Sequence, residues 1–337
     1  MIKDTYLLLL SLIFLYACTN QGSLHAAKDV GSTSNYQWVK SWPQLPPGFL
    51  LGNPTGIGID SAQHIFVFHR ASKEWPLLLP FSKSLIPETT ILELDRNTGK
   101  IINEWGSNLF IMPHSLTVDK DDNIWVTDLG LQQVLKFSHE GSLLMKVGQQ
   151  KVAGDDFSHF NQPTDVAIAL DGSFYVSDGY RNSRVVKFSA TGNYLFSWGS
   201  KGDQPGQFNL PHSIGLDSAG NVYVADRENS RIQMFEPNGK FIQQWKDERF
   251  GKLYAIRLDN KTHTLVAVDY ITNYVFPKGS DIVVLPLDRG PVTRFGRSGR
   301  YDGPVCRYHA VAVDKDGNIY VGDILGNKIQ KFERLAY

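Results

Sequence analysis

The sequence predicts an all-β protein that folds as one six-bladed β-propeller. Among its 337 residues are 30 Gly and 16 Pro, which suits many short strands joined by turns. No apolar run of convincing length has the helical period of 3.6 residues. Six segments along the chain share one pattern: an apolar strand, a turn that usually holds an Asp, and a second strand.

The copies of this pattern have the length and strand content of propeller blades. Asp119 and Asp217 are 98 residues and two copies apart, so one copy takes about 49 residues. A third and a fourth strand follow the turn, as at 183–188 and 194–198. Four strands at this period are typical of blades, and we expect one domain over 37–337. The first strands and their turns lie at 57–60, 116–119, 166–169, 214–217, 256–259 and 311–314.

A second set of Asp residues follows the second strands. We expect these carboxylates to cap turns within the blades and not to act in catalysis. The third strands share spaced Asn, Ile or Val, and Phe residues, as in Asn182, Val185 and Phe188. Together with Gly206-Gln207-Phe208, this pattern resembles NHL repeats, so the propeller is expected to be of NHL type. The Asp set is Asp128, Asp178, Asp226, Asp269 and Asp323.

The composition excludes two broad classes of protein. The 34 Lys and Arg residues balance 34 Asp and Glu, so no basic surplus favours nucleic-acid binding. Because 42% of the residues are hydrophobic and 12% are aromatic, the chain is not a disordered protein. We expect a monomer without a nucleic-acid partner.

The N-terminus has the pattern of an exported protein. The apolar run over 6–16 is too short to span a bilayer but has the length of a signal-peptide core. Leu15-Tyr16-Ala17-Cys18 resembles a bacterial lipobox, so 1–17 is expected to be a lipoprotein signal peptide with a lipid on Cys18. An ordinary secretory signal cleaved near Ala17 is the alternative. The polar stretch over 18–36 suits a flexible tether, which predicts a membrane-anchored lipoprotein on the periplasmic or cell-surface side.

Three histidines occupy the same position in alternate blades. The position lies five residues before the turn, at the entry to the first strand, which lines the central channel of a propeller. Alternate blades are related by about 120°, so His114, His212 and His309 should converge on one point. Three imidazoles with an open fourth position are typical of catalytic zinc, although imidazole also accepts other metals. The six residues in chain order are Thr55, His114, Thr164, His212, Tyr254 and His309.

A second position, just after the second strand, adds polar groups at one mouth of the channel. Arg70 and Arg227 occupy it in two blades, and Tyr180 lies one residue beyond it in a third. A guanidinium suits a carboxylate, and a tyrosine near a metal and an arginine can serve as a base. We expect Glu228 and Arg231 to be structural partners. The role of Tyr270 stays open.

Longer motifs resemble one enzyme family, the peptidyl-α-hydroxyglycine α-amidating lyase domain. The resemblance extends from about residue 45 to the end and includes the insertion over 71–90. It implies a zinc-dependent lyase that cleaves the C–N bond of an α-hydroxyglycine-type hemiaminal to an amide and glyoxylate. The matching segments are Phe68-His69-Arg70, 109–116, 162–167, 177–184, 206–208 with Pro211-His212-Ser213, and 225–229.

The resemblance also implies a role for each site residue. His114, His212 and His309 would ligate zinc. Tyr180 would be the base, Arg70 would support its phenolate, and Arg227 would hold substrate charge. The substrate would be a small molecule or a peptide that carries a carboxylate.

The sequence departs from the family at several positions. Arg307 replaces a Met of the substrate pocket and adds positive charge there. Ala310 replaces the Asp that ligates a structural calcium, so calcium is doubtful although the carbonyls of Ile57 and Leu116 are retained. The family's cysteine pairs are absent, with Arg181 and Met234 at two of their positions.

Two other functions stay open. A zinc-containing propeller could hydrolyse a different anionic substrate held by the arginines. The chain could instead be a non-catalytic surface lipoprotein that binds peptides or glycans, although such a protein does not need three converging imidazoles.

Overall fold

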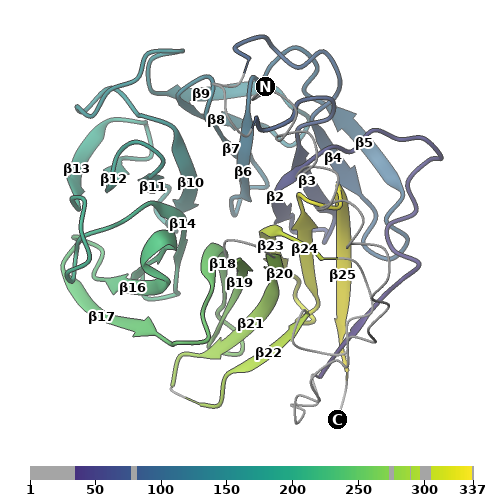
Figure 1. The fold of residues 1–337 in the computed structure, drawn as a ribbon. Coiled ribbons are helices and arrows are strands. Elements are labelled where there is room, and N and C mark those ends of the chain that lie inside the picture. Colours follow the sequence, from purple (N-terminus) through teal and green to yellow (C-terminus); the bar gives the residue numbers. More distant parts are fainter. Residues whose placement is uncertain (1–34, 77–81, 273–276, 289, 297–304, 336–337) are drawn as a thin grey trace, which may run out of the picture. The chain divides into compact units, whose positions relative to one another are not determined.

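The computed structural model confirms an all-β, six-bladed propeller (Figure 1). It describes residues 35–76, 82–272, 277–288, 290–296 and 305–335. Five sheets have four strands, and the fifth blade has an additional short strand. In every blade the strands pair antiparallel, and the first strand in each blade lies nearest the axis.

The first three blades follow one another without exchange of strands. Blade 1 comprises β2 (Pro54–Ile59), β3 (Ile65–His69), β4 (Ile91–Leu94) and β5 (Ile101–Trp105). Blade 2 comprises β6 (Pro113–Val118), β7 (Ile124–Asp128), β8 (Gln133–Phe137) and β9 (Leu143–Val147). Blade 3 comprises β10 (Pro163–Ile168), β11 (Phe174–Asp178), β12 (Arg184–Phe188) and β13 (Tyr194–Trp198).

The last three blades carry the departures from a regular repeat. Blade 4 comprises β14 (Pro211–Leu216), β15 (Val222–Asp226), β16 (Arg231–Phe235) and β17 (Phe241–Lys246), with a 3-10 turn η1 (Arg227–Asn229). Blade 5 comprises β18 (Lys252–Asp259), β19 (Thr264–Thr272), β20 (Pro277–Gly279), β21 (Asp281–Pro286) and β22 (Thr293–Gly296). Blade 6 comprises β23 (Tyr308–Val313), β24 (Ile319–Asp323), β25 (Lys328–Arg334) and the N-terminal β1 (Tyr36–Trp38).

The N-terminal strand β1 closes the ring as the outermost strand of the last blade. It pairs antiparallel with β25, with Tyr36 opposite Arg334. The Val39 amide donates to the Lys331 carbonyl at 2.9 Å, which extends the pairing. The Tyr36 ring also stacks on Phe295 of blade 5, with 4.9 Å between ring centroids. The chain therefore joins its two ends in one sheet, which closes the ring at the seam between blade 6 and blade 1.

The core lies between neighbouring blades. Buried aliphatic and aromatic side chains of adjacent sheets form six clusters, such as the one around Phe68, Phe110 and Phe137. The Asp residues after the second strands cap backbone turns, as expected. Asp128, for example, accepts hydrogen bonds from the amides of Ile111 and Met112 and from two amides of the next turn. These carboxylates fix the loops that carry the polar residues of the channel mouth.

The predicted signal peptide, Cys18 and most of the predicted tether lie outside the described residues. Tyr36, the last residue of that tether stretch, is the first residue of β1. Within the described part of the chain, no helix has the length and apolar character needed to cross a membrane.

Replacing Val39 with Pro should loosen the closure. The substitution removes the amide that donates to Lys331, and leaving that carbonyl unpaired should lower the unfolding free energy by about 1–2 kcal/mol. Urea unfolding measures the loss. Val39→Thr, which keeps the amide and the branched shape, is the control. Equal stability of the two variants would show that this bond does not hold the seam.

Candidate metal centre

Near the start of every inner strand, a β-bulge changes the direction in which one side chain points. The pairing of first and second strands shifts register there in all six blades, for instance between Pro113 and Ser115. The bulged residue in each blade is the one that the sequence places toward the axis. A bulge bends the strand and turns a side chain away from the sheet face. The six bulged residues are Thr55, His114, Thr164, His212, Tyr254 and His309.

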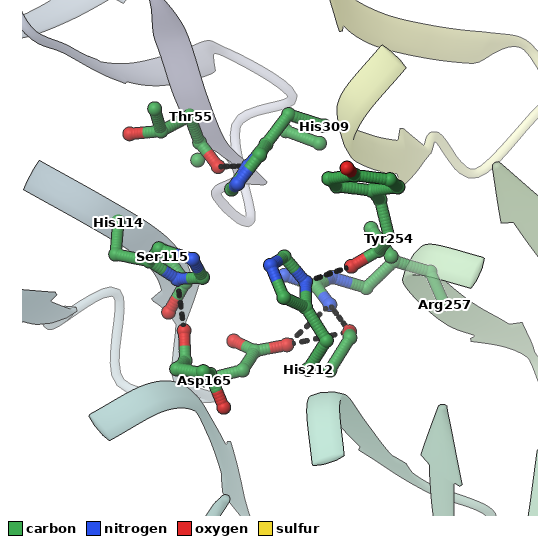
Figure 2. A pocket seen from close by; sticks show the side chains of 13 residues that line it. Thr55, His114, Ser115, Asp165, His212, Tyr254, Arg257 and His309 are labelled. Carbon is green, nitrogen blue, oxygen red and sulfur yellow. Dashed lines mark hydrogen bonds and ion pairs between the residues drawn. The ribbon is translucent and has the colours of Figure 1, made fainter. Parts of the chain in front are cut away.

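The structure brings the three histidines together at the axis (Figure 2). The ring centroid of His114 lies 4.7 Å from those of His212 and His309, and the latter two are 5.0 Å apart. One nitrogen of each ring lies within 4.8 Å of the other two. All three residues are buried.

Each imidazole is held by a backbone carbonyl of the next blade. Nδ1 of His114 lies 2.5 Å from the Thr164 carbonyl oxygen, Nδ1 of His212 lies 2.6 Å from that of Tyr254, and Nδ1 of His309 lies 3.1 Å from that of Thr55. A carbonyl only accepts, so each Nδ1 carries the proton and donates it. The lone pairs of the three Nε2 atoms are left to face the centre.

The rings are neutral in this environment. Burial, followed by the charge of Arg70, lowers the pKa of His114 to about 3. Burial also holds the pKa values of His212 and His309 well below the ordinary value. Neutral imidazoles with Nδ1–H bonded to a second group are the form in which histidine ligates metals. The residues therefore fit a metal ion with three protein ligands and an open position.

Tyr180 reaches the same centre from blade 3. Its hydroxyl lies 3.3 Å from Nε2 of His114 and 3.2 Å from Nε2 of His212. The pKa of the Tyr180 phenol is raised, with burial as the main cause, although the charges of Arg227 and Arg70 act to lower it. The Tyr180 hydroxyl therefore lies next to two members of the triad formed by His114, His212 and His309.

Arg70 contacts Trp75, the aromatic neighbour of Tyr180. It is buried, and its Nε donates to the Pro113 carbonyl at 3.0 Å. Its guanidinium lies over the ring of Trp75, 5.3 Å from the centroid, and Trp75 stacks on Tyr180 at 5.5 Å. Trp75 belongs to the insertion after Arg70, which lies outside the repeat and carries no motif that marks this residue. The insertion thus supplies an aromatic wall to the site.

Arg227 faces the aromatic rings from blade 4. Its guanidinium lies 5.5 Å from the ring centroid of Tyr180 and 4.9 Å from that of Tyr254. Glu228 accepts a hydrogen bond from Nε of Arg227 at 3.0 Å and also pairs with Lys252. Glu228 is therefore a structural partner, as expected, and it fixes the side chain of Arg227.

Arg231 is also structural, because its guanidinium is bound by a buried carboxylate and by backbone carbonyls. Nε pairs with the buried Asp226 at 2.7 Å, and NH2 donates to the carbonyls of Gln204 and Gln207.

Tyr254 links Arg307 to the centre, which the sequence did not reveal. Arg307 donates to the Tyr254 hydroxyl, and its guanidinium lies 5.2 Å from the Tyr254 ring and 4.9 Å from the Tyr270 ring. Tyr254 thus lies between two guanidiniums while its carbonyl holds His212. Its position at the axis was visible in the repeat, but its contacts with two arginines were not.

A guanidinium occupies the channel beyond the triad (Figure 2). Arg257 pairs with the buried Asp165 at 3.2 Å and donates to the Leu116 carbonyl at 3.3 Å. That carbonyl was one of the two expected at a calcium site, and Ala310 in the same pocket offers no side-chain oxygen. Calcium needs six or more oxygen ligands, so the residues present do not fit it.

Comparisons with known proteins agree with this architecture. The NHL repeat family matches residues 160–188 and 208–235. A Caenorhabditis elegans protein named probable peptidyl-alpha-hydroxyglycine alpha-amidating lyase is 33% identical over 310 residues, which cover 86% of this chain and 85% of the nematode protein. Peptidyl-glycine alpha-amidating monooxygenase B of Xenopus laevis is 35% identical over 311 residues.

The two kinds of relative differ in how much of them the chain covers. The match takes in 86% of this chain but 35% of the Xenopus protein, so the chain spans about a third of that relative. Among solved structures, a gluconolactonase from Xanthomonas campestris superposes with a TM-score of 0.58 at 12% identity, over 84% of this chain and 87% of that one. At that identity the likeness concerns the fold alone.

Replacing Arg257 with Ala should destabilise the propeller. Asp165 would keep a buried negative charge without its partner, which should lower the unfolding free energy by about 2–3 kcal/mol. Urea unfolding measures the change, and Arg257→Lys, which retains the charge, should lose less. If Arg257→Ala unfolds like the unchanged protein, the guanidinium does not compensate Asp165.

Proposed function

The chain belongs to the peptidyl-α-hydroxyglycine α-amidating lyase family, and on this premise we propose that it is a zinc-dependent carbon–nitrogen lyase. The proposed substrate is a peptide or small molecule that ends in an α-hydroxyglycine, a hemiaminal with a carboxylate. Cleavage of its C–N bond gives an amide and glyoxylate. One observation carries the proposal: the Tyr180 hydroxyl faces Nε2 of two of three converging, neutral imidazoles.

His114, His212 and His309 would hold the zinc ion through their Nε2 atoms, each oriented by a backbone carbonyl. When bound, zinc supplies a Lewis acid that lowers the pKa of a hydroxyl group. The three imidazoles are buried, and electrostatic interactions are stronger in such an environment than in bulk water.

Tyr180 would move the proton of the reaction. As the phenolate, its oxygen takes the hydroxyl proton of the hemiaminal. The electrons of that O–H bond form the C=O of glyoxylate while the C–N pair leaves on the amide nitrogen. Tyr180 returns the proton to that nitrogen, so the step needs no oxidant or reductant. The positive charges of Arg227 and Arg70 favour the phenolate, and Arg70 also contacts Trp75, which stacks on the Tyr180 ring.

The arginines at the mouth suit the carboxylate of such a substrate. Arg227 and Arg307 approach Tyr254 from two blades, so positive charge gathers beside the triad. A guanidinium can bind a carboxylate through two parallel hydrogen bonds. The charge of Arg307 also favours one second candidate, the hydrolysis of a different anionic substrate at the same centre.

We test the lyase proposal with Tyr180→Phe. Loss of the phenolic oxygen should reduce turnover of α-hydroxyhippurate to benzamide and glyoxylate by about 10²–10⁴-fold, because it removes the base. Zinc content, measured by elemental analysis on the same samples, should stay that of the unchanged protein. A chelator should abolish turnover of the unchanged protein.

An unchanged rate in Tyr180→Phe would remove this residue from the mechanism. A zinc-loaded, unaltered protein that does not turn over the substrate would contradict the lyase reaction and leave hydrolysis as the candidate. Lys187→Ala, at a strand position remote from the triad, serves as the control for handling of the variants.

We further propose that the enzyme is exported and anchored to a membrane through a lipid on Cys18. The apolar run over 6–16 followed by Leu15-Tyr16-Ala17-Cys18 supports this location. Cys18→Ser in the native host should move the protein from the membrane fraction to the soluble fraction after lysis. A protein that fractionates the same way with either residue is not held by this cysteine.

A further inference from the structure

A second group of metal-ligating side chains lies at the junction of blades 1 and 2. Asp60 is in the turn after β2, His64 directly precedes β3, and Glu93 is on β4. His139 reaches the same point from the β8–β9 turn of blade 2. The triad lies at the other end of β2, which is six residues or about 20 Å long. The group is therefore separate from the proposed catalytic centre.

Four potential ligand atoms converge there. Nδ1 of His64 lies 3.1 Å from Oδ2 of Asp60 and 2.8 Å from Oε1 of Glu93. Nε2 of His139 lies 3.1 Å from the same Asp60 oxygen and 3.9 Å from the same Glu93 oxygen. All four atoms lie within 4.8 Å of one another. Ligands about 2.0–2.1 Å from a tetrahedral zinc ion are about 3.3 Å from each other, and the four distances bracket that value.

Burial of the two carboxylates makes a positive partner necessary. The side chains of Asp60 and Glu93 are 1% and 5% exposed, and their facing oxygens belong to the same cluster. Two buried negative charges within 4.8 Å of each other repel unless cations or protons compensate them. His64 and His139 are about a third exposed, so an ion from solvent can reach the group.

Blades 2, 4 and 6 show how this turn is built without a metal. In blade 2 the turn residue Asp119 accepts hydrogen bonds from the side chains of Asn123 and Trp125, and Lys136 pairs with it at 3.1 Å. Blades 4 and 6 repeat the Asn and aromatic donors: Asn221 and Tyr223 donate to Asp217, and Asn318 and Tyr320 donate to Asp314.

Blade 1 changes every one of these donors. His64 stands in place of Asn123, and Phe66, which has no polar atom, stands in place of Trp125. Glu93 is paired with Phe66 as Lys136 is paired with Trp125, so an acid replaces the lysine. The carboxylate Oδ1 of Asp60 still caps the turn through the His64 amide at 2.7 Å. Oδ2 instead faces two histidines and an acid.

Blade 2 contributes the fourth potential ligand, His139, at a turn position where blade 1 has an arginine. Arg96 occupies in blade 1 the turn position that His139 occupies in blade 2, and Arg96 pairs with Asp314 of blade 6. At the junction of blades 1 and 2 the same position holds an imidazole. That ring packs against Phe66 in a T-shaped arrangement, with 5.1 Å between ring centroids.

We propose that Asp60, His64, Glu93 and His139 form a structural site for a zinc-type divalent cation that joins blade 1 to blade 2. Two imidazoles with two carboxylates suit zinc, whereas calcium and magnesium prefer oxygen ligands alone. Protein atoms fill all four positions, which is typical of a structural site and leaves no place for a substrate.

Zinc stoichiometry separates this site from the triad. The full-length protein is stripped with a chelator, titrated with zinc alone, and analysed for bound metal. The unchanged protein should bind two zinc ions per chain, whereas His139→Gln and His212→Ala should each bind one and the double variant none. Glutamine at 139 can still donate to Asp60 but is a poor zinc ligand, so the packing is retained. His159→Gln, which removes a histidine paired with Asp156 elsewhere, should still bind two ions.

Cobalt gives a readout that does not depend on the His139 variant being stable. In His212→Ala, cobalt bound by these four residues should show the strong visible absorption of a tetrahedral ion, and Glu93→Gln in that background should abolish it. If the unchanged protein binds one zinc and His212→Ala binds none, the group is only an ion-pair network and the proposal is overturned. Absence of the cobalt absorption in His212→Ala would overturn it as well.

Discussion

Closure of the ring is the constraint on which the centre of this protein depends. Because β1 pairs with β25, blade 6 is held against blade 1, and the bond from Nδ1 of His309 to the Thr55 carbonyl crosses that seam. His309 and Thr55 are 254 residues apart in the chain. A ring that opened at the seam would lose the orientation of one imidazole of three. The outer strand β1, which closes the ring, therefore also helps to fix the orientation of His309 at the axis.

The six blades divide the work of the centre in pairs. Blades 2, 4 and 6 provide imidazoles, and blades 3, 5 and 1 provide the carbonyls that orient them. One local device, a bulge at the entry of the inner strand, serves both purposes. The chemistry is then added by loops on a rigid scaffold, where Tyr180, Arg227 and the Trp75 insertion surround one side of the triad.

The repeat made the fold and the histidine triad predictable, because both follow from spacing along the chain. The residues that the sequence did not reveal depend on contacts between repeats. Trp75 lies in an insertion without a counterpart in other blades. Arg257 lies within a repeated first strand, but its contacts with Asp165 and Leu116 cross to other blades and cannot be read from the repeat. His139 meets Asp60 only because two turns 79 residues apart face each other across a blade junction. Periodicity locates a residue within its blade but does not say which side chain of the next blade it touches.

The carbonyl partners of the triad affect which substitutions the centre can tolerate. The groups that orient the imidazoles belong to the backbone at Thr55, Thr164 and Tyr254, so replacing those side chains does not delete the group itself. A lineage can therefore vary these three positions to reshape the channel without losing the orientation of the imidazoles. Only two kinds of change then disrupt the triad: substitution of a histidine, or a change that displaces a whole bulge. Such an arrangement allows new specificities to be explored from a centre that stays intact.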